Sequence, residues 1–142
     1  MDKYNKLKLE NQLCFPLYAL SREVIKLYKP YLDKFNLTYT QYITMLAMWE
    51  EEKIIFKELG KKLHLDSGTL TPVLKKLESM EFIIKYRTKE DDRIVIVELT
   101  NKGRELKDQV LDIPEKMYCG VEMSKDEIVL LKYYLEKMLK KF

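Results

Sequence analysis

Two cysteines, Cys14 and Cys119, are the side chains of this 142-residue sequence best suited to covalent chemistry. Two are too few for a disulfide framework, and they lack the spacing of metal ligands. In a reducing compartment such thiols are either inert or redox-active. The single histidine, His64, has no second ligand at metal spacing, so we interpret it as a turn residue. The sequence therefore predicts no metal and no cofactor, and it leaves the two thiols as candidates.

The element expected to hold Cys14 is a helix that extends to about Tyr31 and contains a proline near its start. Pro16 either kinks this helix or is its first residue, because proline cannot donate the backbone hydrogen bond of a helix interior. In the second case Cys14 lies just outside a helix N-terminus, where the positive end of the helix dipole favours the thiolate. Pro30 is expected to end or bend the helix. Its apolar positions recur at helical spacing: Leu13, Leu17, Leu20, Val24, Leu27 and Tyr31.

Between Phe56 and Leu99 a short helix, a turn, a second helix and a two-stranded ribbon follow one another almost without linker. The second helix opens around Asp66 and is expected to begin near Thr69, or to have a distorted first turn, because of Pro72. Two β-branched runs, 82–87 and 93–99, flank a polar tip and predict a hairpin. This order is that of a winged helix-turn-helix. An αα-hairpin with a solvated charged face is the alternative.

This unit is suited to binding duplex DNA, because a helix fits the major groove and a ribbon can contact the backbone or the minor groove. The segment from Lys53 to Lys76 has six lysines against two acids. The net charge of +3 is too small to argue for nucleic acid by itself, so local placement carries the case. The candidate DNA-binding residues are Ser67, Thr69, Thr71, Lys75, Lys76, Arg87 and Arg93.

Helical segments flank this unit on both sides. A helix over 40–50 is expected to bury Trp49 and to end in a solvated acidic run, 50–52. After the ribbon, a helix interrupted by Pro114 precedes a last helix that begins with a capping box, Ser124 and Glu127. We expect a mainly α fold with a small β-wing, in which 40–100 binds DNA and the helices of 1–35 and 104–142 form a homodimer. The alternative is that these helices complete a monomeric core.

Composition bounds the remaining possibilities. With 46% hydrophobic and 35% charged residues, residues 1–142 are expected to form one soluble domain with a proper core. No apolar run has membrane-spanning length, and the first residues lack the apolar stretch of a secretory signal. The sequence therefore predicts a cytoplasmic protein without a membrane partner.

Several blocks of this sequence resemble a known family. Residues 91–100 (Asp91-Asp92-Arg93 and the β-branched run after it), followed by Gly103, resemble the wing signature of MarR-type transcriptional regulators. Four further blocks of this sequence are similar to one branch of that family, the organic-hydroperoxide sensors typified by OhrR. These blocks are 11–15 with Tyr18, 28–30, 37–39 and 65–72.

The resemblance implies a homodimeric repressor that binds a pseudo-palindromic operator, with Arg93 at the minor groove and an organic hydroperoxide as inducer. It implies that Cys14 is the reactive thiol, with Tyr18 nearby and with Tyr28 and Tyr39 of the partner subunit donating hydrogen bonds to it. Phenolic O–H donors stabilise a thiolate relative to the neutral thiol. The resemblance also implies an intersubunit disulfide between Cys14 and Cys119 in the oxidised protein.

Three other functions compete with this interpretation. A MarR-type regulator could be released by a phenolic or other aromatic ligand, with both cysteines as bystanders. A thiol peroxidase could turn over hydroperoxide with Cys14 and Cys119 in the presence of a reductant. The chain could also be a winged-helix module that binds protein instead of DNA. The excess of lysines between Lys53 and Lys76 disfavours this alternative.

Overall fold

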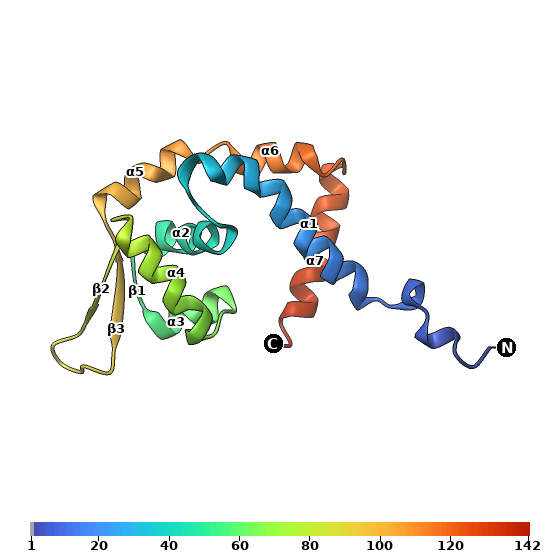
Figure 1. Ribbon diagram of the computed structural model, residues 1–142, viewed down its shortest axis with the longest axis horizontal. Helices are drawn as coiled ribbons and strands as arrows, with labels where there is room; N and C mark the ends of the chain where they lie inside the picture. The colour runs from blue at the N-terminus through green and yellow to red at the C-terminus, as the bar shows by residue number, and fades with distance from the viewer. Residues whose placement is uncertain (1) are drawn as a thin grey trace. The chain divides into compact units, whose positions relative to one another are not determined.

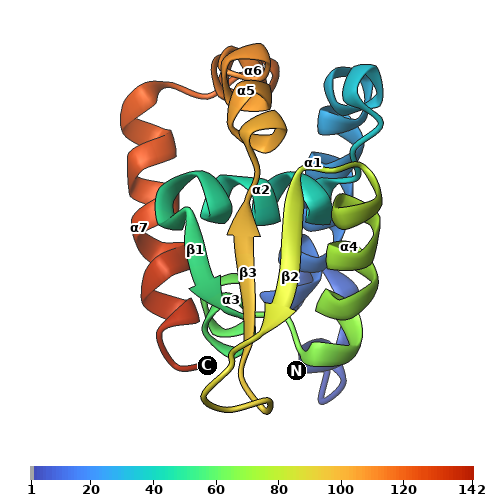
Figure 2. The ribbon, with the colours of Figure 1, turned by 90° about the vertical axis from the view of Figure 1, so that its left-hand side faces the viewer.

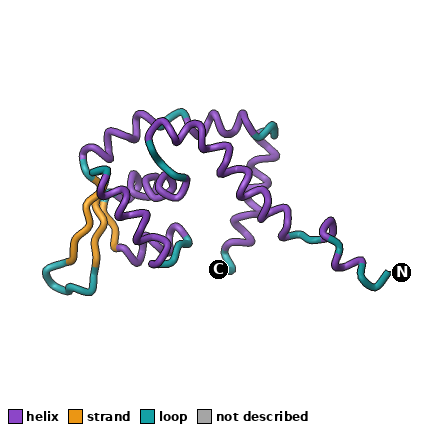
Figure 3. Tube along the Cα trace, viewed as in Figure 1, coloured by secondary structure: helices purple, strands orange, loops and turns teal. Residues whose placement is uncertain are grey.

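The helices and strands of the computed structural model fall into two units, of which the first ends at Leu111 and the second spans Asp112–Phe142. The model describes residues 2–142 (Figures 1 and 3). The first unit contains η1 (Asn5–Leu7), η2 (Leu9–Asn11), α1 (Cys14–Leu32), η3 (Asp33–Phe35), α2 (Tyr39–Glu51), β1 (Lys53–Ile55), α3 (Phe56–Leu63), α4 (Ser67–Ser79), β2 (Ile83–Arg87), β3 (Val95–Leu99) and α5 (Asn101–Gln109). The second contains α6 (Ile113–Gly120) and α7 (Lys125–Leu139). The predicted mainly α fold with a small β-wing is confirmed.

The wing is a three-stranded antiparallel sheet in which β3 lies between β1 and β2 (Figure 2). In the hairpin, Ile83 pairs with Leu99 and Arg87 pairs with Val95. The sequence predicted only these two strands. The third, β1, is three residues long and too short to show an alternating pattern, and it pairs with β3 across Ile54 and Val97.

The core of the first unit is formed by α2, α3 and α4 together with the base of the sheet. Each large apolar side chain buried there contributes about 1.5–3 kcal/mol relative to an exposed one. Trp49 is buried, as predicted. The fully buried side chains of these elements include Met45, Met48, Leu59, Leu70, Leu74, Leu77, Ile83 and Val97.

Three prolines lie further inside their helices than the sequence predicted. The first helix begins at Cys14, so Pro16 occupies its third position, where a backbone N–H has no intrahelical acceptor. Cys14 is therefore the first helical residue rather than a residue just outside the helix. Pro30 lies inside α1, which continues to Leu32. The helix α4 begins at Ser67, two residues before the expected start near Thr69, with Asp66 as its cap and Pro72 in its second turn.

The acidic run at the end of α2 is exposed, as the sequence predicted, and its carboxylates are also ion-paired. The Lys62 ammonium donates to Glu50 at 2.6 Å and to Glu51 at 2.9 Å. The Glu52 carboxylate accepts two hydrogen bonds from Arg104, at 2.8 and 3.1 Å, and these contacts lower the pKa of Glu52. The helix end is thus ion-paired to α3 and to α5.

In the second unit, α6 and α7 follow one another through a short turn. Pro114 is the second residue of α6, so it begins a helix rather than bending one. The predicted capping box of α7 is confirmed, because Ser124 accepts from the Glu127 N–H and the Glu127 side chain accepts from the Ser124 N–H. The apolar stripe of α7 is largely exposed within one copy of the chain, at Leu131, Leu135 and Met138.

Three segments meet at Gly103 in the first turn of α5. The Trp49 indole N–H donates to the Gly103 carbonyl at 2.8 Å, and the Gly103 N–H donates to the Thr100 hydroxyl at 3.0 Å. A Cβ at position 103 would lie 2.2 Å from the Phe82 carbonyl oxygen, closer than real Cβ atoms approach. The first turn of α5 can therefore lie against the base of β2 only because residue 103 is glycine.

We expect Gly103→Ala to lower the free energy of unfolding by about 1–3 kcal/mol, because the added methyl overpacks a contact made by backbone atoms. Thermal unfolding followed by circular dichroism measures the effect. Gly120→Ala is the matched control, since nothing lies within 4 Å of a Cβ there and alanine favours the helix. Equal melting temperatures for the two variants would contradict the close approach at Gly103.

Candidate functional site

The polar face of α4 begins at a helix cap. The Asp66 carboxylate accepts from the Thr69 N–H at 2.8 Å, and the hydrogen bonds from Thr69 hold the pKa of Asp66 below its usual value. His64, two residues before Asp66, adopts the left-handed conformation in the turn between α3 and α4. This agrees with its interpretation as a turn residue. Cap and turn together fix where α4 begins and which face it exposes.

All five predicted DNA-binding residues of α4 are exposed, whereas Leu70, Val73, Leu74 and Leu77 of the same helix are buried. The Thr71 hydroxyl donates to the Ser67 carbonyl at 2.7 Å, which leaves its lone pairs free to accept. With 13 residues, α4 is about 20 Å long, and its width suits the major groove. The face carries three hydroxyls and two ammonium groups: Ser67, Thr69, Thr71, Lys75 and Lys76.

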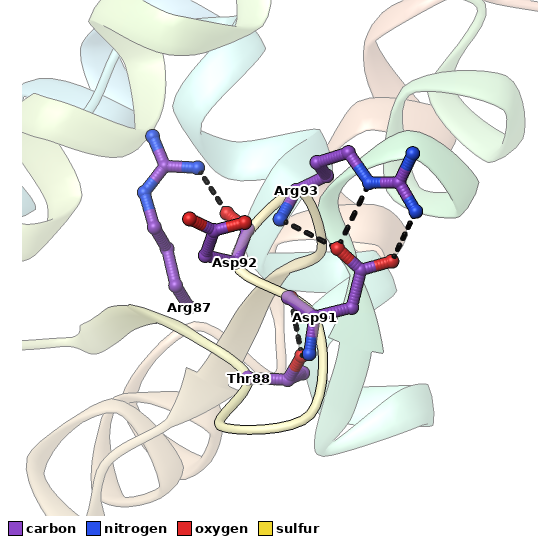
Figure 4. A network of polar contacts seen from close by, with 5 residues as sticks. All are labelled: Arg87, Thr88, Asp91, Asp92 and Arg93. Carbon is purple, nitrogen blue, oxygen red and sulfur yellow. Dashed lines mark hydrogen bonds and ion pairs between the residues drawn. The ribbon is translucent and has the colours of Figure 1, made fainter.

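The tip of the wing is held by a network of polar contacts (Figure 4). Arg93 donates to both carboxylate oxygens of Asp91, through Nε at 3.0 Å and Nη2 at 3.1 Å, and its backbone N–H donates to the same carboxylate. These bonds lower the pKa of Asp91. Arg87 donates to the Asp92 carbonyl at 2.6 Å, and Thr88 closes the loop onto Asp91. Arg87 and Arg93 thus lie on either side of the loop at the end of the hairpin, each held by its own partner (Figure 4).

The basic surface is smaller than the lysine count suggested. Lys61 and Lys62 are ion-paired with acids of α3 and α2, and Lys53 lies over the Tyr86 ring with its ammonium 6.0 Å from the ring centroid. Lys75 and Lys76 have no ion-pair partner among residues 2–142. Of the six lysines between Lys53 and Lys76, those of α4 are therefore available to an external anion, whereas Lys61 and Lys62 are already paired with acids.

Cys14 is exposed in the first turn of α1, with Tyr18 one turn further along the same face. The Tyr18 hydroxyl accepts from Arg22 Nη1 at 3.2 Å, and the guanidinium also lies over the Tyr18 ring. Tyr28 is 14 residues from Cys14 on the same helix, which separates them by about 21 Å along the axis. Cys14 and Tyr28 of one copy therefore cannot contact each other.

A cluster of three tyrosines lies where α1 packs against α2. The ring centroids of Tyr28 and Tyr39 are 4.9 Å apart, and Tyr42 lies 5.7 Å from Tyr28 and 6.4 Å from Tyr39. Burial raises the pKa of Tyr39, because a low dielectric disfavours the phenolate, so Tyr39 remains a neutral O–H donor. Tyr42 is buried and was not among the predicted site residues. Its position one helical turn after Tyr39 was the signal for it.

Cys119 is an exposed residue near the end of α6, in the second unit. Both cysteines are free thiols. The predicted redox residues thus occur as two groups on α1 and α2, Cys14 with Tyr18 and Tyr28 with Tyr39, and as a separate thiol on α6.

Among residues 2–142, no group of three or more His, Cys, Asp or Glu side chains is arranged to hold a metal ion. None of the helices that the structure describes combines the length and the apolarity needed to cross a membrane.

Comparison with known proteins places this geometry in a family. The family model of the transcriptional regulators SarA/Rot matches residues 26–110. The organic hydroperoxide resistance transcriptional regulator of Bacillus subtilis (strain 168) is 46% identical over 97% of this chain and 94% of its own length. The HTH-type transcriptional regulator SarZ of Staphylococcus saprophyticus is 44% identical over 94% of this chain and 91% of its own.

Solved structures of AbfR, a protein of Staphylococcus epidermidis, are similar over almost the whole chain. Reduced AbfR bound to DNA superposes with a TM-score of 0.79 at 34% identity, covering 99% of this chain and 98% of that one. Disulfide-formed AbfR superposes with a TM-score of 0.65 at 32% identity, covering 98% of this chain and 92% of that one. The polar face of α4 and the three-stranded wing agree with the match over residues 26–110. The chain therefore belongs to the SarA/Rot family of MarR-like winged-helix transcriptional regulators, and within this family it resembles the organic-hydroperoxide-resistance type.

Proposed function

We propose that this protein is a homodimeric DNA-binding repressor that is released from its operator when an organic hydroperoxide oxidises Cys14. The observation that carries the proposal is an exposed thiol in the first turn of α1, in a chain 46% identical to a regulator named for organic hydroperoxide resistance. A regulator that binds the chromosome works in the cytoplasm, where reductants keep such a thiol reduced until an oxidant arrives.

The chemistry takes two steps. The Cys14 thiolate attacks the distal peroxide oxygen and the O–O bond breaks, so the thiolate is oxidised to a sulfenic acid and the hydroperoxide, after taking up a proton, is reduced to an alcohol. The Cys119 thiolate of the second copy then attacks the sulfenic sulfur, forms the S–S bond and expels hydroxide, which leaves as water after protonation. One hydroperoxide is consumed per subunit, which distinguishes a sensor from a peroxidase.

Tyr28 and Tyr39 of the second copy are the proposed donors to the Cys14 thiolate, with Tyr18 of the same copy nearby. Support comes from the helix length, which keeps Cys14 away from Tyr28 of its own copy, and from the 4.9 Å ring contact that places Tyr28 beside Tyr39. Because burial keeps Tyr39 protonated, its O–H is available to a thiolate.

Release of DNA follows from the geometry of a disulfide. The bond holds the two Cα atoms within about 7 Å, so its formation moves the segments that carry Cys14 and Cys119. The operator is pseudo-palindromic, and the two α4 helices must meet half-sites about one helical turn apart, about 34 Å. A shift of either copy therefore weakens the groove and phosphate contacts of both.

We expect Cys14→Ser to bind the operator as the reduced wild type does, because Cys14 lies outside the DNA-binding face, and to lose the response to oxidant. Fluorescence anisotropy with the duplex upstream of the protein's own gene, before and after one equivalent of cumene hydroperoxide and again after dithiothreitol, measures both. A Cys14→Ser protein that still releases DNA on oxidation would refute the role of Cys14. A wild type insensitive to peroxide but released by salicylate-like compounds would favour the aromatic-ligand alternative.

Cys119→Ser is expected to remove the covalent dimer that the oxidised wild type shows on a non-reducing gel, and to leave Cys14 as a sulfenic acid that dimedone labels. If a crosslinked dimer persists in Cys119→Ser, Cys14 pairs with its own equivalent and the resolving role of Cys119 is wrong. Multiple turnovers of hydroperoxide per subunit with a dithiol reductant would instead support the peroxidase alternative.

The double variant Lys75→Ala, Lys76→Ala is expected to reduce the slope of log K against log salt by about 2, since each lysine that contacts a phosphate contributes about one counterion. Anisotropy titrations at several salt concentrations measure the slope. Lys61→Ala is the control, because Lys61 is paired with Glu58 on α3 and is expected to leave the slope unchanged. Equal slopes for all three proteins would exclude α4 from the phosphate contacts.

A further inference from the structure

The corner between α4 and β2 joins the helix proposed for the major groove to the strand that leads to the wing tip (Figure 2). Two backbone bonds close this corner. The Glu81 N–H donates to the Glu78 carbonyl at 2.9 Å, and the Phe82 N–H donates to the Leu77 carbonyl at 3.1 Å. Glu81 has a φ of 66°, in the left-handed region that glycine usually occupies just after a helix. The chain thus leaves α4 through a defined turn that a non-glycine residue holds under strain.

The root of β2 is also tied to the segment that follows β3. The Thr100 N–H donates to the Phe82 carbonyl at 3.1 Å, and the Thr100 hydroxyl donates to the Glu81 carbonyl at 2.6 Å. Beyond this root, β2 is an edge strand of the sheet, because β3 lies between it and β1. The direction of β2 past its root therefore depends on what holds its outer edge.

The backbone N–H of Lys85 lies on that outer edge. Residues of an antiparallel strand alternate between those whose N–H and C=O face the neighbouring strand and those whose groups face away from it. The Thr88 N–H donates to the Ile94 carbonyl at 3.0 Å, so Thr88 faces the other arm of the hairpin. Lys85 is three residues earlier on β2, an odd number, and its N–H therefore points away from β3.

The carboxylate of Glu78 accepts a hydrogen bond from this edge N–H, with 3.2 Å between the Lys85 nitrogen and Glu78 Oε2. Glu78 is the second-last residue of α4, and both residues are half-buried where α4 packs against β2. The negative end of the helix dipole lies at this end of α4, so a carboxylate there is unfavourable for the helix itself. The contact that Glu78 makes is with the strand, and it holds β2 at a second point beyond the root.

The second point matters because a strand held only at its root is a lever. Lys85 lies three residues beyond Phe82, about 10 Å along the strand, and Arg87 lies about 17 Å beyond it. A tilt of about 10° at the root would move Arg87 by about 3 Å, at the same rise per residue. Hydrogen bonds are lost over smaller displacements than this. Restraint at Lys85 therefore limits how far the wing can swing relative to α4.

We propose that Glu78 is a positioning residue for DNA binding, which fixes the tilt of the wing so that the wing arginines and the polar face of α4 contact one duplex together. Glu78 itself touches no DNA in this arrangement. It acts through the Lys85 N–H on the strand that carries Arg87, and it reduces the conformational freedom that the wing loses on binding. The inference rests on the proposed function, in which α4 and the wing both bind the operator.

The variants Glu78→Gln and Glu78→Met form a matched pair. Both remove the charge, and glutamine and methionine have similar length and helix propensity, but only glutamine keeps an oxygen that accepts from the Lys85 N–H. Fluorescence anisotropy of the reduced proteins with the duplex upstream of the protein's own gene measures each Kd. We expect Glu78→Gln to bind at least as tightly as the wild type, since it loses a carboxylate that repels phosphate. Glu78→Met is expected to bind about tenfold more weakly than Glu78→Gln.

The ratio of these two Kd values separates positioning of the wing from a general loss of folded protein. In a background with Arg87→Ala and Arg93→Ala, no guanidinium of these residues remains to be positioned, so the ratio is expected to fall below about twofold. In a Thr71→Ala background, about two turns from Glu78 on α4, the ratio is expected to stay about tenfold. The same ratio in all backgrounds would overturn the proposal, because destabilisation of the fold weakens binding in each of them alike.

Hydrogen exchange of the Lys85 amide tests the bond in the free protein, without DNA. We expect this amide to exchange about tenfold faster in Glu78→Met than in Glu78→Gln, because an edge N–H without an acceptor is open to water. Equal exchange rates in the two variants would show that Glu78 does not hold Lys85, and the proposal would be wrong.

The same measurements distinguish failure of this proposal from failure of the proposed function. If the reduced wild type binds the duplex tightly and the two Glu78 variants bind it equally, Glu78 does not position the wing and the proposed function stands. If the reduced wild type binds no duplex, the proposed function is wrong and the role of Glu78 is refuted with it.

Discussion

The approach of Gly103 to the Phe82 carbonyl is the contact on which the DNA-binding unit depends. It lets the first turn of α5 lie against the base of the wing, and there the Trp49 indole N–H and the Thr100 hydroxyl satisfy backbone groups of two different segments. The Glu52–Arg104 ion pair adds a second link between the end of α2 and α5. The helix that leads toward the Cys119 segment is therefore anchored to the same point as the sheet.

A second constraint is the length of α1. A helix is a stiff spacer, and 19 residues keep an N-terminal thiol and a C-terminal tyrosine cluster apart within one copy. Chemistry that needs both groups needs two copies of the chain. In the proposed function, dimerisation therefore completes the redox site and also sets the spacing of the two α4 helices. The exposed apolar stripes of α1 and α7 are the surfaces available for that association.

Charge pairing decides which cations face outward. Lys61 and Lys62 stabilise their own helices and the end of α2, whereas Lys75 and Lys76 stand on the exposed face of α4. On the wing, the Asp91 carboxylate holds Nε and Nη2 of Arg93 and leaves Nη1 outside the pair, while the side chain remains 87% exposed. In the proposed function, this fixed orientation reduces the side-chain entropy that is lost when the guanidinium binds DNA. Asp91 thus holds the Arg93 side chain in one orientation.

Local pattern in the sequence was sufficient for the elements with a strong period or a capping residue. The stripe of α3, the α4 leucines, the hairpin of β2 and β3, the capping box of α7 and the burial of Trp49 all follow from neighbours within a few residues. The wing residues and the thiol of α1 were predicted as site residues because their types and spacing match a family pattern. Periodicity reports which face of an element is buried, and caps report where an element starts.

Only the tertiary structure decided which distant segments meet. The strand β1 exists because β3 offers it hydrogen-bonding partners. The acids at the end of α2 pair with Lys62 and Arg104 because α3 and α5 pack beside them. Tyr42 lies beside Tyr28 because α1 crosses α2 there. The same holds for the contact of Tyr28 on α1 with Tyr39 on α2, whose ring centroids lie 4.9 Å apart. A sequence fixes the properties of each face, whereas contacts between faces depend on how the elements pack. The physical reason is that side-chain pairing across tens of residues is determined by packing geometry and not by local conformational preference.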